Sequence, residues 1–103
     1  MTAPEKKVKQ NVVSVLVELG AYYFYPATGG YGRSGIPDVV ACLDGQFIGI
    51  ECKAGSNKMT PLQKRELQAI EDSGGIAIIY SEPAMSKQDL RKLLRRGEGT
   101  GKD

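Results

Sequence analysis

Residues 34–53 read SGIPDVVACLDGQFIGIECK, and this stretch decides the fold of the chain. It holds two apolar runs, 39–43 and 47–50, which are joined through Asp44-Gly45. An Asp-Gly pair between two such runs is a strong short-range signal for a β-hairpin, because both residues accept the positive φ angles of a tight turn. The stretch therefore predicts two antiparallel strands with a two-residue turn.

The hairpin register brings three charged side chains together. Counting back from the turn puts Asp38 directly opposite Glu51, and side chains alternate along a strand, so Lys53 shares the face of Glu51. Two opposed carboxylates repel each other, and a hard divalent cation would offset that repulsion. The simpler alternative is that Glu51 pairs with Lys53 while Asp38 caps a turn after Pro37.

The elements on either side of the hairpin follow from periodicity and capping signals. Glycine-rich residues 28–35 predict a loop before the hairpin. The predicted order is αβββαβα in one domain, residues 1–96, followed by a disordered tail, residues 97–103. The expected helices are 3–19, which opens with a Thr2…Glu5 capping box, 61–73 and 87–96, and the strands outside the hairpin are 21–25 and 76–80.

Composition narrows the chemistry that the chain can perform. With 103 residues and no histidine, it lacks every imidazole-based catalytic site, so catalysis must use carboxylates, lysine, tyrosine or a metal. A chain this short buries only about two-thirds of its unfolded surface, which favours a homodimer. No apolar stretch approaches the roughly 20 residues that span a bilayer, and the N-terminus has no signal-peptide core, so we expect a cytoplasmic protein.

Charge is unevenly distributed along the chain. There are 14 Lys and Arg against 12 Asp and Glu, but basic residues gather in the N-terminal helix and in the stretch from Lys87 to Lys102. Basic ends are compatible with phosphate binding, and equally with solvated faces that keep the protein soluble.

The combined motifs resemble a known nuclease family. Ser34-Gly35-Ile36-Pro37-Asp38, twelve residues and then Glu51-Cys52-Lys53 resemble the PD-(D/E)xK nuclease signature. Together with Glu5 and Gln63 they resemble the VRR-NUC family in a minimal, stand-alone, phage-type form that is similar to Holliday junction resolvases. This resemblance implies an α/β fold of the restriction-endonuclease type, with a mixed central sheet flanked by helices.

The resemblance also implies roles for individual residues. Asp38, Glu51 and the main-chain carbonyl of Cys52 would bind Mg²⁺ or Mn²⁺, and Lys53 would be the catalytic lysine. Glu5 would reach the metal from the first helix, and Gln63 would support catalysis from the second. Capping-box geometry alone also accounts for Glu5 and Gln63, since each stands three residues after a threonine N-cap.

Several further side chains are candidates for contacts with DNA. They are Arg33 and Ser34 in the glycine-rich loop, Lys6 in the first helix and Lys58 in the loop that follows Lys53. The glycine-rich loop is equally explained as a flexible connection. The tyrosines at 22, 23, 25 and 31 fit packing in the core or a dimer interface better than stacking on bases.

These patterns and the resemblance predict a metal-dependent, structure-specific DNA endonuclease. The expected substrate is branched DNA such as a Holliday junction, cut by a homodimer with two active sites. The compact size and the resemblance suggest a phage-encoded protein in a bacterial host. Two alternatives remain: a nucleic-acid binding module without catalysis, and a nuclease that cuts linear duplex DNA.

Overall fold

The computed structural model describes residues 4–27 and 32–100. The order of elements is αβββαβα, as the sequence predicts, although the capping threonine Thr2 lies outside the described residues. None of the helices in these ranges is long and apolar enough to cross a membrane. The elements are α1 (Pro4–Leu19), β1 (Tyr22–Phe24), β2 (Val39–Leu43), β3 (Gln46–Ala54), α2 (Pro61–Asp72), β4 (Ile76–Glu82) and α3 (Lys87–Arg96).

The β2–β3 hairpin has the predicted turn and register. Asp44 and Gly45 both have positive φ, 53° and 80°, as a tight two-residue hairpin turn requires. The register runs from Leu43 opposite Gln46 to Val39 opposite Ile50. Asp38, one residue before β2, therefore falls beside Glu51.

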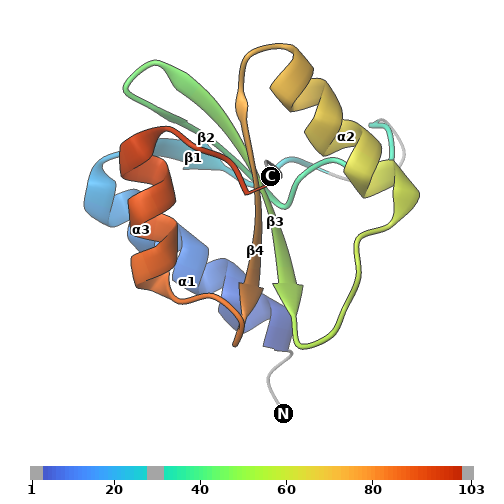
Figure 1. Ribbon diagram of the computed structural model, residues 1–103, viewed down its shortest axis with the longest axis horizontal. Coiled ribbons are helices and arrows are strands. Elements are labelled where there is room, and N and C mark those ends of the chain that lie inside the picture. The colour runs from blue at the N-terminus through green and yellow to red at the C-terminus, as the bar shows by residue number, and fades with distance from the viewer. Residues whose placement is uncertain (1–3, 28–31, 101–103) are drawn as a thin grey trace.

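A four-stranded mixed sheet forms the centre of the molecule. Its order is β1-β2-β3-β4. The pairs β1–β2 and β2–β3 are antiparallel, and β4 pairs in parallel with β3. Figure 1 shows α1 and α3 together on one face of this sheet and α2 on the other. The predicted α/β fold, with a mixed sheet flanked by helices, is confirmed.

The main core lies between α1, α3 and the sheet. Apolar side chains of α1 recur at helical spacing and are fully buried against alternate residues of β3, as the period of two predicts. This packing fixes the axis of α1, and its N-terminal end lies beside the arrowheads of β3 and β4 in Figure 1. The buried side chains of this contact are Val8, Val12, Val15, Leu16, Ile48, Ile50 and Cys52.

The C-terminal tail differs from the prediction of disorder. Gly97 ends α3 in the left-handed conformation. The N–H of Thr100 then donates to the carbonyl of Ala77 at 3.1 Å, and the N–H of Ile79 donates to Thr100 Oγ1. The prediction was wrong for residues 97–100, because the outer edge of β4 offers main-chain partners that a tail can satisfy. Residues 101–103 lie outside the described residues.

Candidate active site

Three carboxylates from three separate elements meet at one end of the sheet. Oxygens of Glu5 on α1, Asp38 before β2 and Glu51 on β3 all lie within 4.8 Å of one another. Glu51 is buried, Asp38 is partly buried and Glu5 is exposed. The structure thus brings together the acidic side chains that the sequence analysis selected as metal ligands.

A main-chain contact holds the carboxylate of Asp38 in place. The N–H of Cys52 donates to Asp38 Oδ2 at 2.8 Å. In a β-strand the N–H and the carbonyl of one residue point to the same side. The carbonyl of Cys52 therefore points to the same side of β3 as Asp38, where it is available as a further oxygen ligand.

The surroundings of Glu51 disfavour the ionised form of its side chain. Burial, and then the nearby charge of Asp38, raise the pKa of Glu51 to about 8, although Lys53 acts in the opposite direction. At neutral pH the carboxylate cluster therefore retains a proton in the absence of a cation.

Gln63 connects the lysine to the carboxylates. Lys53 Nζ donates to Gln63 Oε1 at 2.8 Å, and Gln63 Nε2 donates to Glu51 Oε2 at 2.9 Å. Lys53 itself lies 3.6 Å from Glu51, which is the ion pair of the simpler interpretation. Gln63 also completes the capping box with Thr60, so its capping contact and its contact with the site occur in the same side chain.

A close contact with α2 holds the loop that leads to Asp38. Gly35 has φ of +86°, and a β-carbon there would lie 2.6 Å from the carbonyl carbon of Leu62 in the first turn of α2. Only glycine fits this approach. The loop residues 28–31, part of the predicted phosphate-contacting stretch, lie outside the described residues.

The four residues proposed for DNA contacts are all exposed: Lys6, Arg33, Ser34 and Lys58. Arg33 Nε donates to Glu66 Oε2 at 2.7 Å, and the side chain of Glu66 is buried. The sequence analysis missed this ion pair. It ties the loop to α2, so Arg33 has a structural partner besides any phosphate.

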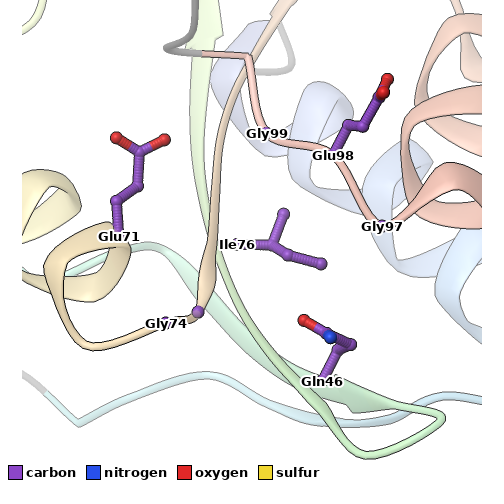
Figure 2. A pocket seen from close by; sticks show the side chains of 8 residues that line it. Gln46, Glu71, Gly74, Ile76, Gly97, Glu98 and Gly99 are labelled. Carbon is purple, nitrogen blue, oxygen red and sulfur yellow. The ribbon is translucent and has the colours of Figure 1, made fainter.

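A separate hollow of about 510 Å³ lies at the opposite end of the sheet. It is formed where β3 and β4 begin, as Gln46 and Ile76 show, whereas the carboxylate cluster lies toward the end of β3. Figure 2 shows the carboxylates of Glu71 and Glu98 on either side of it. Two carboxylates without a lining cation disfavour a phosphate, so this hollow does not extend the candidate active site.

The donor set fits a divalent metal ion. All the candidate ligands are oxygens, which suit Mg²⁺ and Mn²⁺. A cation would offset the burial of the charge and the repulsion by Asp38, which together raise the pKa of Glu51. The residues that would hold it are Glu5, Asp38, Glu51 and the carbonyl of Cys52.

Comparison with known proteins places the chain in a family of nucleases. The chain belongs to the archaeal Holliday junction resolvase (Hjc) family, whose profile matches residues 4–83. A further relative is "Putative nuclease p44" of Acyrthosiphon pisum secondary endosymbiont phage 1. It is 34% identical over 93 residues, which cover 87% of this chain and 90% of the relative.

Solved structures share the fold. A VRR_NUC domain superposes with a TM-score of 0.73 at 24% identity, covering 91% of this chain and 97% of that one. A VRR_NUC domain protein has a TM-score of 0.67 at 16% identity, covering 98% and 96%. Hjc of Archaeoglobus fulgidus, a Holliday junction resolvase, has a TM-score of 0.57 at 17% identity, covering 81% and 77%. The expected resemblance to VRR-NUC nucleases and Holliday junction resolvases is confirmed.

Proposed function

We propose that the protein is a metal-dependent endonuclease that hydrolyses phosphodiester bonds in branched DNA. The observation that carries this proposal is the convergence of Glu5, Asp38 and Glu51 within 4.8 Å, with Lys53 Nζ 3.6 Å from Glu51. A carboxylate cluster with an adjacent ammonium group is suited to a reaction in which negative charge develops at a phosphate.

Each group of the chain has a distinct task. Asp38, Glu51 and the Cys52 carbonyl would hold Mg²⁺ or Mn²⁺, and Glu5 would reach it directly or through a water molecule. When bound, the metal lowers the pKa of a water molecule and polarises the phosphate. Lys53 orients the attacking water or stabilises the charge that develops on the phosphate. Gln63 positions Lys53 and Glu51 through its two hydrogen bonds.

Branched DNA is the substrate that the relatives favour. The family is described as a Holliday junction resolvase family, and Archaeoglobus fulgidus Hjc is named as one. A four-way junction contains strands related by twofold symmetry, so a homodimer with two active sites would cut a symmetric pair. The phage relative supports a phage-encoded protein that acts in the cytoplasm of a bacterial host.

The two alternatives differ in what they need from the site. A binding module without catalysis has no use for opposed carboxylates, one of them buried, near the phosphate path. A nuclease for linear duplexes keeps the metal site, but sequence-specific cutting would need an element that reads the major groove. Neither alternative accounts for the carboxylate cluster and the family relationship together.

The deciding experiment compares an end-labelled four-way junction with a matched linear duplex, each incubated with Mg²⁺, Mn²⁺ or EDTA. Paired cuts at the junction that require the metal and disappear in Asp38→Asn and Lys53→Met support the proposal. Equal cutting of both substrates would favour the nuclease for linear duplexes. Metal-independent binding with no product would favour the binding module.

A further inference from the structure

A basic hollow with an aromatic wall lies between α1 and the end of β1. Its volume is about 400 Å³, and it is lined by Lys6, Lys9, Gln10 and Tyr25. We propose that this hollow binds one unpaired nucleotide of the DNA strand that enters the active site, with its phosphate on Lys6 and Lys9 and its base on Tyr25. This inference rests on the proposed function and adds a subsite to it.

Two elements, α1 and β1, relate the position of the hollow to that of the carboxylate cluster. On α1, Lys9 lies one helical turn after Glu5 and therefore shares its face, and Lys6 is the next residue in the chain. On the sheet, Phe24 is opposite Val40, so Tyr25 continues the strand beside Val39, next to Asp38. A strand whose phosphate reaches the cluster has its neighbouring nucleotide within reach of this hollow.

Tyr25 presents a ring that is held in place but accessible. Its side chain is 50% exposed, and Tyr23 contacts it edge-on with ring centroids 6.1 Å apart. Lys9 Nζ lies 5.5 Å from the centroid, over the ring, so this face of Tyr25 is directed toward the lysines of the hollow. When the flexible Lys9 side chain turns to a phosphate, the ring face becomes available to a base.

The charges of the hollow explain why its ligand is a nucleotide in a DNA strand. Three neighbouring carboxylates repel a phosphodiester, and the ammonium groups of Lys6 and Lys9 supply the attraction that brings it there. An aromatic face adds nothing to the binding of a phosphate alone, but it stacks with any base.

The nucleotide must be unpaired, because a base within a duplex has both faces covered by its neighbours and cannot lie on Tyr25. Base stacking is interrupted where helices meet, so a base there is unpaired at a lower cost than within a continuous duplex. The hollow would therefore favour cutting near a branch point over cutting within a continuous duplex, without reading sequence.

Binding of a short labelled oligothymidine in EDTA, followed by fluorescence anisotropy, tests the subsite separately from cleavage. We expect Tyr25→Ala to weaken binding about tenfold and Tyr25→Phe to retain it, since stacking needs the ring alone. Lys6→Gln with Lys9→Gln should weaken binding and reduce the slope of log affinity against log salt by about 0.7, the value for one neutralised phosphate on a single strand.

Matched controls lie nearby. Tyr22, on the same strand as Tyr25, is 71% exposed on the other face of the sheet, and Lys7 is an exposed lysine of α1 that does not line the hollow. Tyr22→Ala should leave affinity unchanged within about twofold, and Lys7→Gln should do so too, apart from a small change in the salt slope. Thermal melting identifies any variant that fails to fold. If Tyr25→Ala does not fold, oligothymidine binding by Tyr25→Leu and by the lysine variants tests the subsite instead.

Three results would overturn the subsite. One is an equal effect of Tyr25→Ala and Tyr22→Ala on oligothymidine binding. Another is a loss of duplex binding by Tyr25→Ala as large as the loss of single-strand binding. The third is an unchanged salt slope in the variant that lacks Lys6 and Lys9. Absence of cleavage in all metals would instead contradict the proposed function, and the binding measured in EDTA would still report on the hollow.

Discussion

Gly35 and Leu62 approach so closely that a β-carbon at residue 35 would lie 2.6 Å from the carbonyl carbon of Leu62. This contact joins the loop before β2 to the first turn of α2. The same loop carries Asp38 and the same helical turn carries Gln63, so one backbone contact sets the separation of two parts of the candidate active site.

Gly35→Ala should therefore damage both stability and activity. A positive φ costs an alanine about 1–2 kcal/mol, and the clash with Leu62 adds to that cost and displaces the loop. We expect a lower urea midpoint and at least about a tenfold loss of cleavage, since small displacements of reacting groups are costly. Gly45→Ala is the control, because Gly45 also has positive φ but no atom lies near its missing β-carbon. Equal loss of activity in both variants would contradict this interpretation.

Gln63 is expected to matter more for activity than for stability. Gln63→Ala removes its bonds to Lys53 and Glu51 together with the capping contact, whereas Thr60→Ala removes only a capping partner. Loss of the Thr60 cap should cost about 1 kcal/mol in unfolding experiments and leave kcat nearly unchanged. Gln63→Ala should show a similar loss of stability and a fall in kcat of at least about tenfold. If the two variants lose activity equally, Gln63 is a capping residue and nothing more.

The raised pKa of Glu51 predicts how stability depends on pH without metal. The folded protein keeps the Glu51 proton up to about pH 8, and the unfolded chain releases it near its ordinary value of 4.5. Stability should therefore fall as pH rises between these values. Glu51→Gln removes this loss, so at pH 9 it should raise the free energy of unfolding by at least on the order of 1 kcal/mol, the equivalent of one pKa unit.

Urea unfolding at pH 4 and pH 9 in EDTA measures this difference, with Glu98→Gln as an exposed control of the same charge change. At pH 4 the free energy of unfolding of Glu51→Gln should differ little from that of the wild type. The variant should cleave no DNA with any metal. A midpoint equal to that of the wild type at pH 9 would show that Glu51 does not strain the folded protein.

Arg33 is expected to stabilise the folded protein through its ion pair with Glu66. Arg33→Gln leaves the buried carboxylate of Glu66 without its ion-pair partner and should lower Tm. The double variant Arg33→Gln with Glu66→Gln should recover most of the loss, because it leaves no unpaired buried charge. A thermodynamic cycle of the four proteins measures the coupling between the two side chains. Additive losses would place the importance of Arg33 elsewhere, including in contact with DNA.

Short-range patterns were enough to predict the hairpin and the core of the site. The Asp44-Gly45 turn fixes the register, and a period of two then places Asp38 beside Glu51 and puts Lys53 on the same face. The position of Glu5 came from family resemblance, because the packing angle of α1 on the sheet is not encoded in any local pattern.

The contacts that sequence reasoning missed are all long-range. Arg33 and Glu66 are 33 residues apart, and no spacing rule connects a loop to a helix at that separation. Gln63 illustrates a different difficulty. In the sequence, a glutamine at this position is explained equally well by a capping box and by a role in the active site. The structure shows that its one carboxamide group makes both the capping bond and the bonds to Lys53 and Glu51.

The contact of Thr100 with β4 also covers part of an edge of the sheet that could otherwise pair with another chain. An unpaired strand edge is a template on which another chain can form a strand, and such growth leads to aggregates. Residues of the chain's own tail occupy main-chain groups of Ala77 and Ile79 on that edge, while β1 at the opposite edge is three residues long. Removing the tail after Arg96 would expose a long edge strand, so even a protein with an intact active site would then be prone to precipitate.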